Sequence, residues 1–170
     1  MRNLSMPGSE IPDWFSQEAI FSERKNHELR AVIIGVVVSL DSQSLQNSIG
    51  QLPAMPDILV RIHEPHRVIF STALYLLGLP RSHEDQVHLC WYPQCHPLVS
   101  MLKEGCKIDV IKRNPSFVEG VHLKKHGIYL VYEDDVEIGG NEEILDESQQ
   151  SVSQRLAKFF NSIQEDGHVS

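Results

Sequence analysis

Two histidines near the middle of the chain come closest to a known catalytic pattern. The segment His63-Glu64-Pro65-His66 resembles the H-E-x-x-H signature of zinc proteases, in which two histidines one helical turn apart bind the metal. Here the histidines are closer together than in that signature, and the proline between them does not fit a helix interior. We therefore predict no zinc hydrolase at this segment.

The cysteines form the second candidate metal set, together with one histidine (Cys90, Cys95, His96 and Cys106). The three cysteines lack the spacing of a zinc knuckle or of a disulfide framework, and their odd number suits free thiols in a reducing compartment. Cys90 and Cys106 also fall on strand positions that we expect to face inward, where cysteine behaves as a small hydrophobic residue. We predict no bound metal and no disulfide.

Other catalytic patterns are equally weak. The chain has no G-x-S-x-G elbow, phosphate loop or dinucleotide fingerprint. Asp134 and Asp135 could be considered an acid pair, but neighbouring residues on a strand point to opposite faces. We predict no catalytic residues, no cofactor and no enzymatic activity.

Composition and charge indicate a globular domain with an acidic tail. The 170 residues suit one domain, and 41% hydrophobic and 22% charged residues are ordinary values. Eight of the acidic side chains lie in residues 133–147 without any Lys or Arg, which leaves 15 acidic and 15 basic residues elsewhere. Nucleic-acid binding usually requires a basic excess, so we expect no nucleic-acid partner. The start lacks the apolar core of a signal peptide, and Ala31–Val38 is too short to cross a membrane.

The elements that would position any site are predicted to be strands. Apolar alternation and turn residues mark strands at Leu29–Leu40, Ile58–Ile62, Val87–Tyr92, Cys106–Lys112 and Val121–Asp135. The continuous apolar run Leu29–Leu40 predicts a central strand buried on both faces, and its Gly35 suits a close backbone approach. Residues 41–56 read as a loop, and Arg67–Leu77 could be strand or helix. Convincing helices are lacking before residue 140, so we predict an all-β antiparallel sandwich.

The last of these strands has one fault in its alternation. Val121 and Leu123 point to one face, whereas Ile128 and Leu130 have the opposite parity. One extra residue at Lys125–Gly127 would restore the phase, and glycine accommodates a β-bulge at little steric cost.

The tail differs in character from the sandwich. We assign residues 1–136 to the sandwich domain and 137–170 to an acidic linker followed by a short amphipathic helix. Val152, Leu156, Phe159 and Ile163 have helical spacing, with Ser148 or Ser151 as candidate caps. This helix would pack on its own domain, fray or bind a partner. Because clustered carboxylates repel one another, we expect residues from Glu137 onward to be removable without unfolding the sandwich.

Two segments carry a resemblance to a known family. The segment at residues 6–15, MPGSEIPDWF, resembles the Leu-Pro-Gly-Ser-Glu-Ile-Pro-x-Trp-Phe opening of the domain that follows the leucine-rich repeats in plant intracellular immune receptors of the TIR type. The segment at residues 121–133, VHLKKHGIYLVYE, resembles that family's closing strand, Val-x-Val-Lys-Lys-x-Gly-x-x-Leu-Val-Tyr-Glu. The resemblance covers about residues 4 to 135 and implies a jelly-roll or immunoglobulin-like sandwich.

The resemblance also implies a function. It predicts a non-catalytic recognition domain that binds a pathogen effector protein together with the preceding leucine-rich repeats of the same receptor. The NAD-cleaving activity of such receptors belongs to a TIR domain, which this sequence does not contain. The implied location is the cytoplasm or also the nucleus, without a membrane partner.

The predicted binding residues lie in loops and in the N-terminal motif. Surface loops on a rigid sandwich can vary freely, so we expect effector contacts from the loops at 81–86, 93–100 and 114–119, namely from Arg81, His83, Glu84, Gln94, His96 and Phe117. The junction with the repeats is predicted at Pro7, Gly8, Trp14 and Phe15, although Trp14 and Phe15 could instead fill the open end of the sandwich. Two alternatives remain: a structural cap on the repeat solenoid, and a carbohydrate-binding module that uses Trp91 and Tyr92 as a platform.

Overall fold

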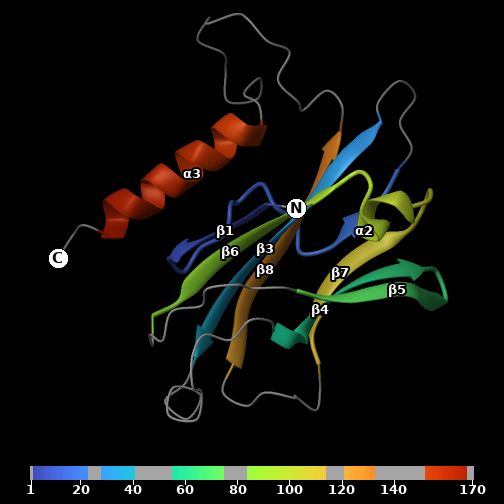
Figure 1. Cartoon of the computed structure of the whole chain (residues 1–170), viewed down its shortest axis with the longest axis horizontal. Coiled ribbons are helices and arrows are strands. Elements are labelled where there is room, and N and C mark those ends of the chain that lie inside the picture. Colours follow the sequence, from blue (N-terminus) through green and yellow to red (C-terminus); the bar gives the residue numbers. More distant parts are fainter. Residues whose placement is uncertain are drawn as a thin grey trace, which may run out of the picture.

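The chain, seen in a computed structural model, folds into two antiparallel β-sheets packed face to face (Figure 1). The structure describes residues 2–22, 28–40, 55–74, 84–113, 121–132 and 152–167. These residues form strands β1 (Arg2–Pro7), β2 (Ala19–Ile20), β3 (Leu29–Leu40), β4 (Met55–Glu64), β5 (Arg67–Leu74), β6 (Gln86–Pro93), β7 (Lys107–Lys112) and β8 (Val121–Tyr132), and helices α2 (Pro97–Ser100) and α3 (Val152–Gly167). The predicted all-β sandwich is confirmed.

The strand order shows how the chain wraps around its core. The first sheet has the order β1-β6-β3-β8 and the second sheet has the order β2-β7-β4-β5. Every step from one strand to the next changes sheet, except the β4–β5 hairpin. Such repeated crossing between two four-stranded sheets is typical of a jelly roll.

The core between the sheets consists of the inward residues of each strand. Val32, Ile34 and Val36 of β3 pack in one cluster with Val60 and Ile62 of β4, and all five are fully buried. Alternation along β4 and β7 places polar residues outward, as the sequence pattern predicts. The ambiguous segment that begins at residue 67 is strand β5, and the predicted loop at 41–56 ends earlier than expected because β4 begins at Met55.

Helix α2 was not expected, since no helix was predicted before residue 140. It is one turn long and follows β6 directly. His96 caps it by accepting a hydrogen bond at Nδ1 from the Leu98 N–H at 3.1 Å, and Pro97 occupies the first helical position. Proline at the first helical position favours a helix start, whereas histidine is not a common capping residue, so the sequence contained only part of the local signal.

The predicted irregularity in β8 exists, but it lies nearer the start of the strand. Pairing with β3 passes from Leu123 opposite Val38 to Lys125 opposite Val37, so that Lys124 is the extra residue. This bulge returns Ile128 and Leu130 to the inner face. The prediction placed the insertion at Lys125–Gly127. Gly127 is in regular pairing with Gly35 instead, and its role is different.

Helix α3 lies along the outer side of the first sheet (Figure 1). Val152 and Leu156 are buried against that sheet, and Phe160 continues their stripe at the next turn. The sequence pattern had assigned this third position to Phe159; both rings are half-buried, but the one packed against this cluster is Phe160. The candidate caps Ser148 and Ser151 and the side chain of Ile163 lie outside the described residues.

Candidate functional site

The two outer faces of the sandwich differ in what lies over them. The outer side of the first sheet, here called the covered face, carries a second apolar cluster of Ala31, Ile33, Leu89 and Val131 with Phe15, Val152 and Leu156. This cluster joins the sheet to both the N-terminal segment and α3. The outer side of the second sheet, here called the open face, keeps its side chains exposed or half-buried.

Phe15 is anchored on the covered face by two glycines that face each other across β3 and β8. Gly35 pairs with Gly127, and the aromatic ring and Cβ of Phe15 lie over them. A Cβ on Gly127 would stand 2.8 Å from Phe15 Cβ and 2.7 Å from Ile11 Cδ1, closer than real Cβ contacts allow. A Cβ on Gly35 would lie 2.9 Å from Leu89 Cδ2 and 3.2 Å from Phe15 Cε2, so the groups that approach Gly35 closely are side chains and not the backbone that the sequence suggested.

The N-terminal segment also closes the outer edge of β8. The Ser16 N–H donates to the Ile128 carbonyl oxygen at 2.9 Å, and the Ile128 N–H donates back at 2.7 Å. Lys125 Nζ lies 2.7 Å from Glu10 Oε2 on the same side. An edge strand with unpaired backbone groups is a site for unwanted pairing, and this contact protects the middle of β8.

Trp14 links the N-terminal segment to α3. Its ring packs edge-on against Tyr129 at 4.6 Å between centroids, and the Arg155 guanidinium lies 4.0 Å from the Trp14 ring centroid. Arg155 Nη1 also donates a hydrogen bond to the Tyr129 hydroxyl at 3.5 Å. A cation over an indole is attracted by the negative face of the ring, so Arg155 helps hold α3 on the covered face.

The open face is arranged in rows that cross the second sheet. One row runs from Ile20 of β2 through Lys107 and His63 to Val68 of β5. Ile20 is 68% exposed and Val68 is 46% exposed, which is unusual for large apolar side chains at two edges of one face. A parallel row places Leu59 opposite Ile111, and both are half-buried.

Between these rows lies a charged network. Arg61 donates two hydrogen bonds to Asp109, from Nε at 3.0 Å and from Nη2 at 2.9 Å, and His63 Nε2 lies 2.9 Å from Asp109 Oδ2. Desolvation by itself raises the pKa of Asp109, but the hydrogen bonds and charges of Arg61 and His63 outweigh it, so that this pKa is lowered. The planar fork of Arg61 fixes the carboxylate geometrically, which makes the centre of the open face a rigid polar patch.

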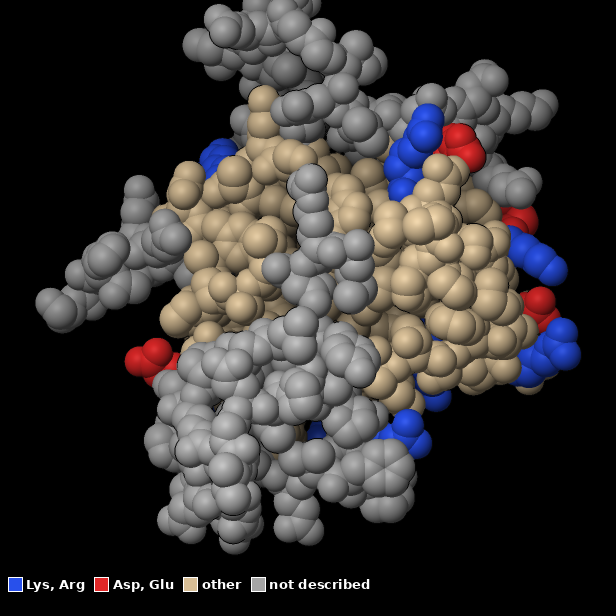
Figure 2. Space-filling view, viewed as in Figure 1, with Lys and Arg blue, Asp and Glu red and all other residues tan. Residues whose placement is uncertain are grey.

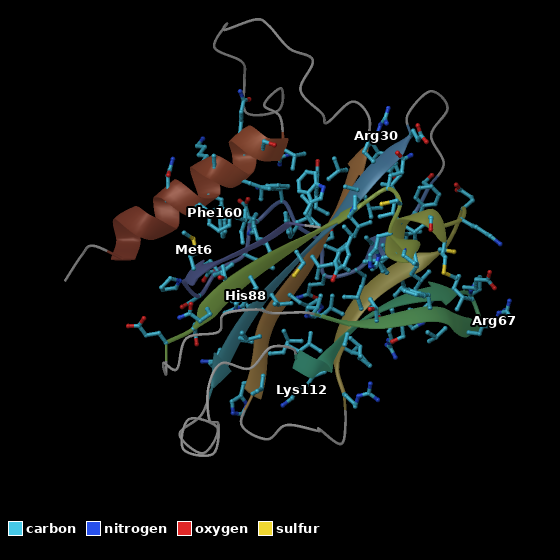
Figure 3. The ribbon with its side chains drawn as sticks, in the orientation of Figure 1. Met6, Arg30, Arg67, His88, Lys112 and Phe160 are labelled. Carbon is cyan, nitrogen blue, oxygen red and sulfur yellow. The ribbon has the colours of Figure 1, made fainter. Side chains whose placement is uncertain are left out.

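Charges elsewhere are mixed. In the view of Figure 2, Lys and Arg side chains stand beside Asp and Glu around the rim of the described surface, without a broad field of one sign. Arg67, at the tip of the β4–β5 hairpin, pairs with Glu64 at 3.1 Å (Figure 3). Mixed charges of this kind suit a protein surface better than a phosphate backbone.

A cavity of about 220 Å³ lies between α3 and the β1 side of the covered face. Figure 3 shows Phe160 on the side of α3 that faces β1. The cavity is lined by Leu4, Ile33, Leu89, Trp91, Ser153, Leu156, Ala157 and Phe160. Trp91 therefore faces this space under a helix, and Tyr92 is buried in the core. Trp91 is half-exposed and Tyr92 lies in the core, so the two rings do not form the open platform that a carbohydrate-binding module would use.

The described residues that flank the predicted effector-binding loops lie at two ends of the first sheet. Gln86 and Val121 both lie near the Leu40 end of β3, whereas Pro93 lies opposite Ala31 at the other end. Gln86 and Val121, the described residues next to two of these loops, are thus separated from Pro93 by the length of β6. Arg81, His83 and Phe117 lie outside the described residues.

The other three predicted loop residues, Glu84, Gln94 and His96, lie in the described part of the chain. Glu84 is exposed just before β6. Gln94 donates from Nε2 to Glu28 Oε1, and His96 caps α2 while its ring lies 4.7 Å from that of Tyr92. Burial and the positive N-terminus lower the pKa of His96. His96 thus has a structural role that the prediction did not include.

The predicted junction residues separate into two groups. Pro7 ends the edge strand β1 and is exposed, and the Gly8 N–H donates to the Asp85 carbonyl oxygen at 2.9 Å beside Glu84. Trp14 and Phe15 pack on the covered face, so the expectation that they fill an open end of the sandwich is wrong. Phe15 is buried within its own domain.

The open face was missed by the sequence reasoning. Arg61 and His63 alternate with the inward Val60 and Ile62, which was a visible signal of an outward polar pair. Their meeting with Asp109 depends on the register of β4 against β7, and single-strand alternation carries no information about register.

The potential metal ligands of the described residues are dispersed. They contain no group of three or more His, Cys, Asp or Glu side chains placed to hold a metal ion. Cys90 and Cys106 are buried as predicted, burial raises the pKa of the Cys90 thiol to about 12, and Cys95 is exposed. His88 is buried in the first sheet, where burial lowers its pKa to about 4.

None of the helices in the described part of the chain is long and apolar enough to cross a membrane. No family model, curated protein or solved structure matches the chain.

Proposed function

We propose that this chain is a non-catalytic recognition domain of a plant intracellular immune receptor of the TIR nucleotide-binding leucine-rich-repeat type. In such a receptor it would act in the cytoplasm or nucleus and bind a pathogen effector together with the preceding repeats. The observation that carries the proposal is the contact between the two segments on which the family resemblance rests.

Those two segments are far apart in the sequence but pack as one unit. Phe15 of the first lies over Gly127 of the second, and Glu10 pairs with Lys125. Trp14 contacts Tyr129 in the same unit. All of these except Tyr129 are positions that the family pattern specifies, so packing gives a physical reason for the two motifs to occur together in one chain.

The open face is the surface that best suits recognition. It combines exposed apolar side chains, Ile20 and Val68, with a rigid polar centre at Arg61 and Asp109. Apolar anchors around a fixed bidentate ion pair resemble the composition of protein–protein interfaces, where arginine is enriched. We propose that an effector protein with an apolar patch docks on this face.

The experiment uses the complete receptor in a plant cell-death assay with effector. Ile20→Glu combined with Val68→Glu places charge on the open face, where both side chains are exposed, so the receptor should accumulate normally and lose its response. Asn161→Glu, an exposed position on α3, is the matched control and should keep the response. A double variant that accumulates and responds fully would leave recognition to the repeats and reduce this domain to their structural cap.

A further inference from the structure

We propose that the cavity under α3 is a binding site for a compact, neutral, mainly apolar small molecule of about the size of one substituted aromatic ring. This goes beyond the proposed function and does not depend on it. The cavity lies on the covered face, away from the Arg61–Asp109 network of the open face, so a ligand there would not compete with an effector docked on that face.

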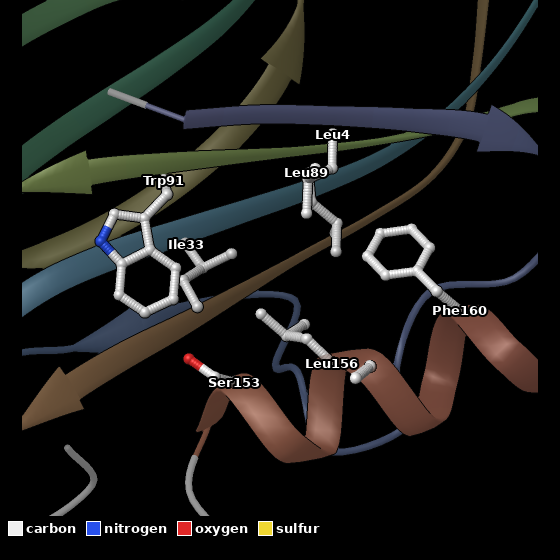
Figure 4. Close-up of a pocket in the computed structure, with 8 residues that line it drawn as sticks. Leu4, Ile33, Leu89, Trp91, Ser153, Leu156 and Phe160 are labelled. Carbon is white, nitrogen blue, oxygen red and sulfur yellow. The ribbon is translucent and has the colours of Figure 1, made fainter. Parts of the chain in front are cut away.

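The walls of the cavity come from two separate parts of the chain. Ile33, Leu89 and Trp91 project from the sheet, and Leu156 and Phe160 project toward them from α3 (Figure 4). Helix and sheet pack together through Val152 and Leu156, and a space remains beside that contact. Native interiors are close-packed, and apolar spaces larger than one water molecule are few in a domain.

The size of the cavity limits what can occupy it. An apolar cavity of about 150 Å³ accommodates benzene or xenon. The present volume of about 220 Å³ leaves room for one ring with a short substituent. Leu4, Ser153 and Ala157 are exposed while they line the cavity, which gives a small molecule a way in from the surface.

Water is a poor occupant of this space. A buried water molecule needs two to four polar partners. Among the described residues that line the cavity, Ser153 has the only hydroxyl group, and no lining side chain is charged. Displacing poorly held water by an apolar group is favourable, whereas a charged ligand would lose its hydration without gaining a counter-ion.

Ser153 then defines the preferred ligand more narrowly. Its hydroxyl points toward the sheet near Ile33 and Trp91 (Figure 4). A ring that carries one neutral hydroxyl can form a hydrogen bond there that a bare hydrocarbon cannot. A neutral hydrogen bond is worth on the order of a five-fold change in affinity.

The test measures binding of three ring compounds to the whole chain. Benzyl alcohol, toluene and benzoate share one ring and differ in hydroxyl, hydrocarbon and charged substituent. Binding is followed in the unchanged chain by the tryptophan emission, to which Trp91 in the cavity wall contributes, and by the shift in Tm. We expect benzyl alcohol and toluene to bind saturably, with the higher affinity for benzyl alcohol, and we expect no binding of benzoate.

Two cavity variants complete the test. Ala157→Leu fills the space from α3 and should abolish binding of both neutral compounds, whereas Asn161→Leu on the exposed side of the same helix should leave it unchanged. Ser153→Ala should remove the roughly five-fold preference for benzyl alcohol over toluene. The proposal is overturned if neither neutral compound binds saturably, if benzoate binds equally well, or if both variants at the cavity leave binding unchanged. Should Ala157→Leu fail to fold, the Ser153→Ala and benzoate results still decide.

Discussion

The covered face and the open face of the sandwich are both formed by alternate strand residues, but other described segments of the chain pack only on the covered face. On the first sheet, outward residues such as Ile33 and Val131 are apolar, and segments from both ends of the described chain lie over them. On the second sheet, outward positions alternate between apolar and charged side chains, and Ile20 and Val68 remain in solvent. A covered apolar face contributes to stability, and an exposed mixed face can change without unfolding the domain.

The glycine pair shows why the covered face is specific. Gly35 and Gly127 leave the room that Phe15 fills, so the aromatic anchor and the two glycines depend on each other. On the open face, by contrast, the fixed element is the Arg61–Asp109 ion pair, which orients side chains without drawing another segment over them. The comparison separates residues that serve the fold from residues that are free to serve a partner.

The same substitution on the two faces gives the largest expected contrast. Val131→Asp buries an unpaired charge at a position that is 1% exposed, and should cost about 4 kcal/mol or more, enough to prevent accumulation. Val68→Asp on the open face should cost about 1 kcal/mol or less. Urea unfolding of both variants measures the difference. Equal costs would mean that the two faces are not distinguished by burial.

Removing α3 tests how much this helix contributes to the stability of the sandwich. The sequence suggested that residues from Glu137 onward are dispensable, but Val152 and Leu156 are buried against the sheet. A variant that ends at residue 136 should lose about 3 kcal/mol of unfolding free energy, since burying one such side chain contributes about 1.5–3 kcal/mol. The combined emission of Trp14 and Trp91 should shift to longer wavelength, because residues of α3 lie next to both rings. Unchanged stability would restore the original expectation.

Histidine titration distinguishes the core of the first sheet from the open face. Burial lowers the pKa of His88 to about 4, so the folded state favours its neutral form. The stabilisation is complete above the unfolded pKa of about 6.5 and is lost as pH falls toward 4. The free energy of unfolding should therefore fall by about 2 kcal/mol between pH 7 and pH 5. His88→Leu should remove this part of the acid sensitivity. His63→Leu on the open face is the control, and an equal loss of acid sensitivity in that variant would contradict the assignment to His88.

The smallest expected effect concerns the ion pair of the open face. The lowered pKa of Asp109 means that its contribution is present above the unfolded pKa near 3.9 and is lost as pH falls through the folded value. Asp109→Asn should cost about 1 kcal/mol at pH 7, because Arg61 and His63 are partly solvated, and almost nothing near pH 2. Unfolding at both pH values measures this. A difference that persists in acid would point to packing instead of charge.

The sequence predicted the fold better than the site, for identifiable reasons. Strand β3 was predicted with its observed bounds because a continuous apolar run leaves few alternatives. The bulge was expected from parity alone, but parity cannot say which residue between Leu123 and Ile128 is extra. The open face depends on register between β4 and β7, and the packing of α3 depends on a partner surface that no local pattern describes.

The candidate binding residues stay predictions, and the structure adds local roles for two of them. Loop residues such as Gln94 and His96 were chosen because loops commonly carry binding residues, whereas the structure gives His96 a capping role and separates its loop from residue 86 by the length of β6. The aromatic anchor at Phe15 was recognised as important from its motif. Its site of burial became visible only when Gly35 and Gly127 were placed opposite each other.

Hydroxyl-radical footprinting of the receptor with and without its effector tests the central claim most directly. The account predicts that Ile20 and Val68 are readily oxidised in the free receptor and become protected when effector binds, while Phe15 and Val131 are protected in both states. Protection on effector binding that is confined to α3 and the covered face, or strong oxidation of Phe15 and Val131 in the free receptor, would contradict it.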